Sequence, residues 1–188
     1  MTNVPNPNVV DADTLTGDLR PLRRTAFALG SNLGDRLDFL QAAVDTLTDS
    51  SEIVPVAVSP VYESEPVDTP DGSPKFLNAV LVVDTTLSPR SLMERAQSTE
   101  TAYGRTRGEP NAPRTLDIDV LAVGDVTSDD DDLRVPHPRL AERAFVLVPW
   151  ADVDPEFSVP GMGRVLELSS AVDATGVRRL EESLEIPA

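Results

Sequence analysis

The stretch RTLDIDV, residues 114–120, decides the fold and points to the chemistry. Its apolar residues alternate with aspartates, and this period of two predicts a strand that is buried on one face. The carboxylates of Asp117 and Asp119 then project from the other face, with Cα atoms roughly 6–7 Å apart. Two like charges this close repel each other unless a cation lies between them. The pair is therefore a candidate Mg²⁺ site, because Mg²⁺ takes one or two carboxylates together with water and phosphate oxygens. A solvated strand face is the alternative.

Arginines surround this acidic strand in a chain whose net charge is strongly negative. The chain has 16 Lys and Arg residues against 32 Asp and Glu residues, a formal charge of -16. Arg105 and Arg107 lie just upstream, and Arg114 directly precedes the strand. Guanidinium groups bind phosphate oxygens through paired hydrogen bonds, so arginines beside a Mg²⁺ site indicate a polyphosphate ligand. Surface Arg–Asp pairs that balance an acidic protein are the alternative.

Length and composition restrict the class of protein. A chain of 188 residues predicts a single domain. A pI near 4.3 argues against nucleic acid or an anionic membrane as a partner, but it allows a small phosphate ligand in one basic pocket. The absence of cysteine excludes disulfides, zinc thiolate sites and a thiol nucleophile. The N-terminus has no apolar core of signal-peptide length and the chain has no apolar run of transmembrane length, so we expect a cytoplasmic protein. We also expect a monomer.

The pattern along the chain predicts two tails and one domain. Residues 1–23 are polar and show neither the strand period of two nor the helical period of 3.6, so we expect a poorly ordered tail. We expect residues 175–188 to form a weakly structured tail. The domain between them covers residues 24–174. Its expected elements are strands at 25–29, 53–62, 76–85 and 116–120, helices at 35–47 and 88–104, a hairpin turn at 124–125, a solvated loop at 129–132 and a short helix at 140–145. Strands grouped around two long helices predict an α+β fold with a largely antiparallel sheet.

Motif searches narrow the ways in which phosphate can be bound. The chain has no Walker loop and no protein-kinase signature. The glycine pair of residues 30–34 lacks the third glycine of a dinucleotide fingerprint, so it indicates a tight turn. His137, the only histidine, lies between two prolines in VPHPR, residues 135–139. This placement suits a hydrogen bond to a ligand phosphate, although a lone loop histidine is often incidental.

Six stretches, in the same order, resemble the 6-hydroxymethyl-7,8-dihydropterin pyrophosphokinase family. They are FALGSNLGD (27–35), SPVYESEP (59–66), FLNA (76–79), PRTLDID (113–119), VPHPR (135–139) and RAF (143–145). The resemblance implies a ferredoxin-like sheet flanked by helices on both faces. It also implies that ATP gives its terminal pyrophosphate to the pterin hydroxymethyl group and that AMP leaves, a reaction of folate biosynthesis.

The resemblance assigns roles to individual residues. The expected catalytic residues are Arg105, Arg107, Arg114, Asp117 and Asp119, and the two aspartates would hold two Mg²⁺ ions. The expected ATP-binding residues are Gln97, Glu100, Arg105, Arg107, Arg114, Ile118, Arg134, His137 and Arg143. The expected pterin-binding residues are Gly30, Ser64, Val67, Phe76, Asn78 and Phe145. Aromatic stacking suits a flat heterocycle, and the Asn78 amide both donates and accepts, which fits a pyrimidine edge.

The chain departs from the family pattern in the segment that precedes the acidic strand. Pro110 and Asn111 stand where members often carry an Arg-Trp pair, and Asp132 and Arg134 stand where many have a basic residue and a threonine. Two other functions remain as alternatives: a non-catalytic pterin- or nucleotide-binding paralogue, and a metal-dependent phosphohydrolase that uses water. The intact aspartate pair argues against the first, and the aromatic residues have no role in the second.

Overall fold

A six-stranded antiparallel sheet forms the centre of the protein. The structure is a computed structural model, which describes residues 21–66, 72–105 and 114–187. The strands are β1 (Arg23–Ser31), β2 (Ile53–Val58), β3 (Tyr62–Ser64), β4 (Phe76–Thr85), β5 (Asp117–Val123) and β10 (Val177–Arg179). Their order is β10-β3-β4-β1-β5, and β2 pairs with β4 beside β3. Residues 1–20, where most of the expected N-terminal tail falls, lie outside the described residues.

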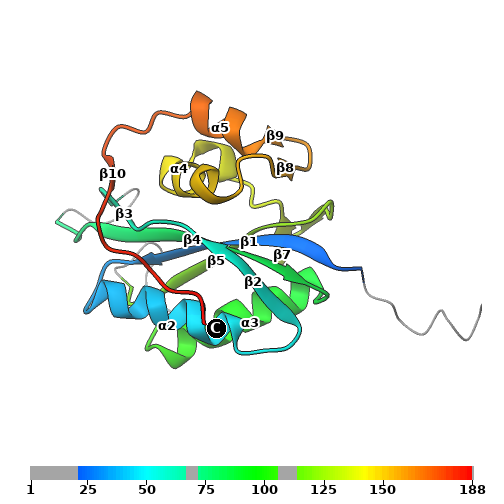
Figure 1. Ribbon diagram of the computed structural model, residues 1–188, viewed down its shortest axis with the longest axis horizontal. Helices are drawn as coiled ribbons and strands as arrows, with labels where there is room; N and C mark the ends of the chain where they lie inside the picture. Colours follow the sequence, from blue (N-terminus) through cyan, green and yellow to red (C-terminus); the bar gives the residue numbers. More distant parts are fainter. Residues whose placement is uncertain (1–20, 67–71, 106–113, 188) are drawn as a thin grey trace, which may run out of the picture.

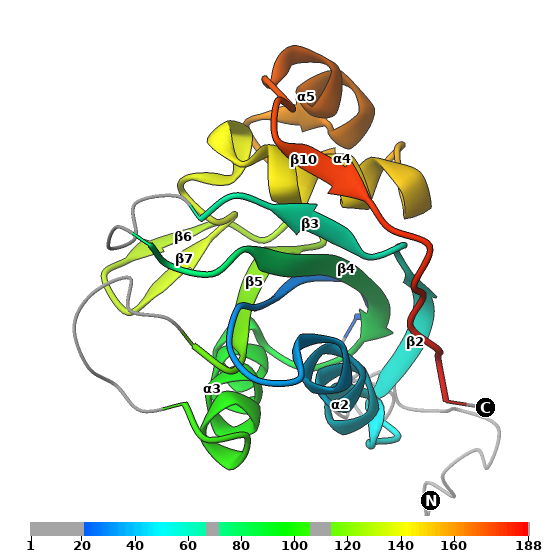
Figure 2. The ribbon, with the colours of Figure 1, turned by 90° about the vertical axis from the view of Figure 1, so that its left-hand side faces the viewer.

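Two helical connections give the sheet its ferredoxin-like topology. Helix α2 (Arg36–Thr48) joins β1 to β2, which are parallel because each is antiparallel to β4 between them. Helix α3 (Pro89–Ala102) joins β4 to β5, which are parallel because each is antiparallel to β1. Helices α2 and α3 cover one face, whereas α4 (Ala144–Val153) and α5 (Val165–Ala171) lie on the other (Figures 1 and 2). The expected α+β, ferredoxin-like fold with helices on both faces is confirmed.

The sheet separates two apolar cores, and β4 contributes to both. Leu81 and Val83 pack into the core beneath α2 and α3, whereas Val80 and Val82 pack into the core beneath α4 with the fully buried Trp150. A strand buried on both faces carries apolar residues at successive positions, which explains why the β4 sequence does not alternate. The strand occupies residues 76–85, as predicted.

Local signals also placed the two long helices. Ser88 caps α3, because its Oγ accepts a hydrogen bond from the backbone N–H of Ser91 at 3.2 Å, and Pro89 is the first helical residue. Helix α2 begins and ends one residue after the expected 35–47. Among the described helices, none is long and apolar enough to cross a membrane.

The β-hairpin lies at residues 128–135 rather than around the expected turn at 124–125. Gly124 and Asp125 do form a turn, closed by the Val126 N–H donating to the Val123 carbonyl at 3.0 Å. The paired strands, however, are β6 (Ser128–Asp130) and β7 (Leu133–Val135), so part of the expected loop at 129–132 is strand. The expected short helix at 140–145 is a 3₁₀ turn, η1 (Leu140–Glu142), followed by α4; β8 (Ser158–Val159) then pairs with β9 (Gly163–Arg164).

Within residues 175–188, for which we expected a weakly structured tail, the structure has a short strand and several specific contacts. Strand β10 pairs with β3, and the chain then runs alongside β2 (Figure 2). Leu184 is buried in the core beneath α2 and α3, and the backbone N–H of Glu185 donates to Gln41 Oε1 at 2.8 Å. These partners lie far away in the sequence, so the local pattern of a charged, aperiodic segment cannot predict them.

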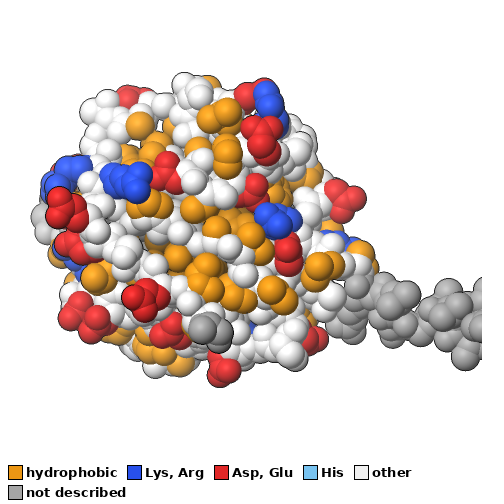
Figure 3. All heavy atoms as spheres, viewed as in Figure 1, with side chains coloured by type: hydrophobic (Ala, Val, Ile, Leu, Met, Phe, Trp, Pro, Cys, Tyr) orange, Lys and Arg blue, Asp and Glu red, His pale blue; other side chains and the backbone are white. Residues whose placement is uncertain are grey.

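The surface reflects the acidic composition. On the face seen in Figure 3, acidic side chains are distributed over the surface among fewer basic ones, in line with the net charge of -16. An arginine-rich site is therefore a local exception on this molecule.

Candidate active site

A cavity of about 270 Å³ lies between the sheet and the N-terminus of α4. Its floor is a row of residues paired across the strands: Asp117 of β5 opposite Gly30 of β1, and Gly30 opposite Asn78 of β4. Residues that face each other in an antiparallel ladder project from the same face of the sheet. The register therefore brings the acidic strand and the FLNA stretch to one surface, although they are far apart in the sequence.

Gly30 keeps the middle of this floor flat. A Cβ at this position would lie 3.7 Å from Asn78 Oδ1, 3.7 Å from Phe76 Cδ1 and 3.8 Å from the Asp117 Cβ. A flat ligand can therefore rest on the β1 backbone between the aromatic and acidic ends of the cavity. Glycine suits this position because it lets a ligand approach the backbone closely, and not because the backbone needs an unusual conformation.

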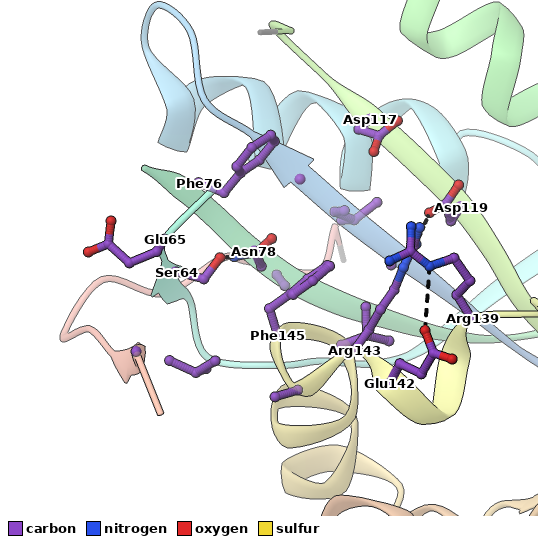
Figure 4. A pocket seen from close by; sticks show the side chains of 18 of the residues that line it. Ser64, Glu65, Phe76, Asn78, Asp117, Asp119, Arg139, Glu142, Arg143 and Phe145 are labelled. Atoms are coloured by element: carbon purple, nitrogen blue, oxygen red, sulfur yellow. Dashed lines mark hydrogen bonds and ion pairs between the residues drawn. The ribbon is translucent and has the colours of Figure 1, made fainter. Parts of the chain in front are cut away.

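The first end of the cavity, which we call the ring end, is aromatic. Phe76 and Phe145 lie on opposite sides of the cavity, and Asn78 lies between them (Figure 4). The buried Asn78 donates from Nδ2 to Ser64 Oγ at 2.9 Å and to the Tyr62 carbonyl at 3.4 Å. Because the donor side of the amide is engaged within the sheet, Oδ1 is the atom that Asn78 presents beside Gly30.

The second end, the charged end, contains both aspartates of β5. Asp117 Oδ1 accepts hydrogen bonds from Arg105 Nη1 at 2.8 Å and Arg114 Nη1 at 2.9 Å. Asp119 Oδ2 accepts one from Arg143 Nη1 at 2.8 Å. These guanidinium groups relieve the repulsion expected between neighbouring carboxylates. The Arg–Asp pairs are therefore present, and they lie at the wall of a cavity rather than on an open surface.

Glu100 links α3 to the beginning of the acidic strand. Its buried carboxylate accepts the backbone N–H of Ile118 at 2.7 Å and forms an ion pair with Arg105. Burial raises the pKa of Glu100, while the Ile118 N–H and the Arg105 charge act in the opposite direction. Glu100 and Ile118 thus lie behind the cavity wall. There, Glu100 holds both β5, through the Ile118 N–H, and the side chain of Arg105.

His137 faces the charged end from the segment before η1. Its Nε2 lies 3.8 Å from Asp119 Oδ2, and its Nδ1 accepts the backbone N–H of Arg139 at 3.1 Å. Burial lowers the pKa of His137, although the neighbouring Asp119 opposes this shift. An imidazole that accepts at Nδ1 carries its proton at Nε2, so the neutral ring presents an N–H donor to the site.

The structure brings most of the expected residues to one cavity but not all of them. The cavity lining includes Gly30, Ser64, Phe76, Asn78, Arg114, Asp117, Asp119, Arg143 and Phe145. Gln97 is exposed on α3, and Arg134 is exposed on β7, where it pairs with Asp131 at 2.9 Å. Their roles in binding ATP stay predictions. Val67, Arg107, Pro110 and Asn111 lie outside the described residues.

Asn32 is a positioning residue that the sequence did not reveal. Its buried side chain accepts the Arg114 backbone N–H at Oδ1, 2.8 Å away, and donates to the Pro74 carbonyl at 3.3 Å. Its own N–H donates to the Arg114 carbonyl at 3.2 Å. The turn after β1 therefore holds the backbone of Arg114 beside the acidic strand. The only local signal was an asparagine in a glycine-rich turn.

The donor set fits Mg²⁺ better than a metal that needs a complete protein cage. Within the described ranges, no group of three or more His, Cys, Asp or Glu residues could hold an ion. Asp117 and Asp119 offer two carboxylates at the wall of an open cavity. Mg²⁺ commonly takes one or two carboxylates and fills its octahedral shell with water and substrate phosphates, so the two residues suffice if a polyphosphate supplies the remaining oxygens.

Comparisons with known proteins show which family this chain resembles. Residues 26–155 match the model of the family described as 7,8-dihydro-6-hydroxymethylpterin-pyrophosphokinase (HPPK). The 2-amino-4-hydroxy-6-hydroxymethyldihydropteridine pyrophosphokinase of Pseudomonas aeruginosa is 40% identical over 159 residues, which cover 85% of this chain and 98% of that protein. The protein of the same name from Mycobacterium tuberculosis is 38% identical over 181 residues, covering 88% of this chain and 94% of the relative.

A solved structure supports the fold independently. A chain of Plasmodium falciparum HPPK-DHPS superposes with a TM-score of 0.63 at 15% identity, over 82% of this chain. This chain covers 45% of that longer chain. At so low an identity, the likeness concerns the ferredoxin-like fold alone.

Proposed function

The chain belongs to the 7,8-dihydro-6-hydroxymethylpterin-pyrophosphokinase family, and we propose that it transfers the terminal pyrophosphoryl group of ATP to 6-hydroxymethyl-7,8-dihydropterin in folate biosynthesis. One observation carries the proposal: a ring pocket and a carboxylate–arginine cluster share a single cavity, joined across the flat floor at Gly30. A binding site for a heterocycle beside a binding site for phosphates is what this transfer requires.

The ring end would bind and orient the pterin. Phe76 and Phe145 are placed to stack on its two faces, and Asn78 Oδ1 is placed to accept a hydrogen bond from its pyrimidine edge. With that edge at Asn78 and Ser64, the hydroxymethyl group at the other end of the ring points toward Asp117 and Asp119. Its oxygen would then attack the β-phosphorus of ATP and lose its proton to water, while the bond to the α–β bridging oxygen breaks and AMP leaves.

The charged end would hold the triphosphate. Arg105, Arg114 and Arg143 already lie within hydrogen-bond distance of the two carboxylates, so their guanidinium groups are placed to donate to phosphate oxygens as well. His137, which presents an N–H donor, adds a neutral contact at the same end. Asp117 and Asp119 would hold two Mg²⁺ ions, which supply charge neutralisation for the transferring and leaving oxygens.

An assay of AMP formation tests the proposal. We expect AMP only when ATP, the pterin and Mg²⁺ are all present, and none after EDTA is added. Release of AMP or phosphate without the pterin would indicate the phosphohydrolase alternative. Binding of the pterin without AMP formation would indicate the non-catalytic paralogue.

We propose that the monomer suffices for activity, because the ring end and the charged end both lie within one domain, between its central sheet and α4. Light scattering on the purified protein at assay concentration, combined with the AMP assay, tests this point, and activity confined to a larger assembly would contradict it.

A further inference from the structure

The C-terminal segment contributes a wall to the cavity that the family match does not include. The match ends at residue 155, yet Asp173, Thr175, Gly176 and Val177 all line the cavity. None of them belongs to the residues expected from the sequence. The segment that was predicted to be a weakly structured tail therefore takes part in shaping the site.

The register of the sheet shows which end of the cavity this wall closes. Val177 of β10 lies opposite Ser64 of β3, and Ser64 lies opposite Phe76 of β4, so the three side chains project from the same face. Strand β5, which carries the acidic pair, lies at the other edge of the sheet. Val177 therefore stands beyond Ser64, at the end of the cavity farthest from Asp117 and Asp119.

Ladder pairing, short hydrogen bonds and ion pairs hold this wall in place. Before β10, Asp173 Oδ1 accepts the Thr175 N–H at 2.9 Å and the Val177 N–H donates to the Ala174 carbonyl at 3.0 Å. Gly176 adopts a φ of +83°, and a Cβ there would lie 3.8 Å from Glu65 Cγ. Its left-handed conformation strongly favours glycine, and it lets the turn pack against Glu65, which is itself part of the lining.

The end of β10 is tied to the helix that carries Phe145. Arg179 Nη1 lies 3.6 Å from Asp152 Oδ2 on α4, and the Tyr62 hydroxyl donates to the same oxygen at 2.7 Å. Arg178 projects from the opposite face of the sheet, where its 70% exposed side chain pairs with Glu63 at 3.2 Å, and so exposed a pair contributes little to holding the wall. Ladder pairing thus fixes the wall relative to β3, which carries Ser64, and the Asp152 contacts fix it relative to α4, which carries Phe145.

We propose that Val177 and the turn at residues 173–176 form an end wall that determines which substituents the pterin can carry on its 2-amino edge. The inference rests on the proposed function, because it assumes that the hydroxymethyl group points toward Asp117 and Asp119. The 2-amino group lies at the other end of the bicyclic ring, and this end faces Ser64 and Val177. Val177 is then a specificity-determining residue that contacts the substrate edge through its methyl groups.

Changing the bulk at position 177 tests the wall in both directions. Titration calorimetry with a non-hydrolysable ATP analogue present would compare the natural pterin with one methylated on its 2-amino nitrogen. We expect Val177→Ala to weaken binding of the natural pterin about three- to tenfold, because two partly buried methyl groups are lost. The same variant should raise the affinity of the methylated pterin, relative to the natural one, about fivefold or more, while Val177→Ile should lower that ratio.

Arg178→Ala is the matched control, because its side chain leaves the same strand toward the other face. We expect it to keep both pterin affinities within about twofold of wild type, and all three variants to keep ATP-analogue affinity within about twofold. The proposal would be contradicted if the ratio of the affinities for the two pterins stayed unchanged in both position-177 variants, or if Arg178→Ala shifted this ratio as much as they do. If wild type forms no pterin-dependent AMP, the proposed function itself fails. If Val177→Ala unfolds on heating before binding is measurable, the isoleucine variant decides alone.

Discussion

The two ends of the cavity are built from different interactions. At the charged end, Asp117 and Asp119 are 27% and 33% exposed and are held by guanidinium groups. At the ring end, Asn78 is 5% exposed and is held by Ser64 within the sheet. Ion pairs between partly exposed groups exchange partners at little cost, whereas a buried hydrogen bond is costly to break. The comparison teaches that the charged end is suited to exchange arginine partners for phosphate and metal, while the ring end keeps a fixed shape.

Replacement of either aspartate should give the largest effect. Asp117→Asn and Asp119→Asn should each lower kcat by about 10²–10⁴-fold, because the transferring phosphates lose their main source of charge stabilisation. The free energy of unfolding should change by only about 1 kcal/mol or less, since these pairs are partly exposed. Quenched AMP assays and thermal unfolding measure the two quantities.

The conservative control for the aspartates is Glu167→Gln, which removes an exposed carboxylate that pairs with Arg164 and is not part of the cavity lining. It should leave both kcat and stability close to wild type. If either aspartate variant turns over like this control, the charged end does not perform the chemistry and the contrast between the two ends fails.

Loss of an aromatic ring should affect only the ring end. Phe76→Ala should weaken pterin binding about 10–100-fold and change ATP-analogue binding less than about twofold, because a stacking face is removed while the arginines stay in place. Phe145→Ala should act similarly, with a somewhat larger effect on ATP, because Arg143 Cζ lies 5.8 Å from the Phe145 ring. Calorimetric titration with each ligand separates the two.

Phe39→Ala serves as the matched aromatic deletion, because Phe39 stacks edge-on with Tyr103 outside the cavity. A loss of ATP-analogue affinity as large as the loss of pterin affinity in Phe76→Ala would mean that Phe76 is core packing. The two ends would then not be separable.

A methyl group on the floor should disturb the border between the two ends without disturbing the fold. In Gly30→Ala the new Cβ meets its neighbours at 3.7–3.8 Å, which is ordinary van der Waals contact. We expect an unfolding temperature within about 2 °C of wild type but pterin affinity about tenfold lower, because the methyl group occupies the surface on which the ring rests. A lower unfolding temperature with unchanged pterin affinity would show that the ring does not lie over β1.

The smallest effect should come from Tyr62, which supports the ring end from the edge. Burial, with the Asp152 hydrogen bond second, raises the pKa of Tyr62 from 10.0 to about 12. The unfolded chain therefore loses this proton first, so the stabilisation is complete below pH 10 and is lost as pH rises from 10 to about 12. Tyr62→Phe should cost about 1 kcal/mol at pH 7 and flatten the pH dependence in that window.

Tyr103→Phe, which removes the other tyrosine hydroxyl, is the control for Tyr62. Its hydroxyl contacts Thr46 at 3.1 Å on the far side of the sheet. Denaturant unfolding at a series of alkaline pH values would reveal the difference. If Tyr62→Phe and wild type lose stability in parallel between pH 10 and 12, the Tyr62–Asp152 contact does not contribute as described.

Helices and strands that carry a local sequence signal were predictable, whereas the distant residues that they contact were not. The alternation around Asp117 predicted β5, and Ser88-Pro89 predicted the beginning of α3. The contact of Asn32 with Arg114 joins residues 82 positions apart, and β10 is three residues of an aperiodic segment. Such contacts depend on the register of the assembled sheet, and no short-range pattern encodes that register. The family resemblance filled part of this gap by naming Asn78 and Phe145, but it did not extend to Val177.

The row that forms the floor extends across nearly the whole chain. From Asp117 and Gly30 it continues through Asn78 and Tyr62 to Arg179, one residue from each of five strands. Its members span Gly30 to Arg179 in the sequence, so a fragment that lacks either end of this span does not contain the complete row. Recovery of pterin affinity during refolding should therefore lag behind recovery of helical circular dichroism, since closing long loops is slower than forming helices. Substrate affinity in this protein is, in effect, a measure of whether the chain has finished folding.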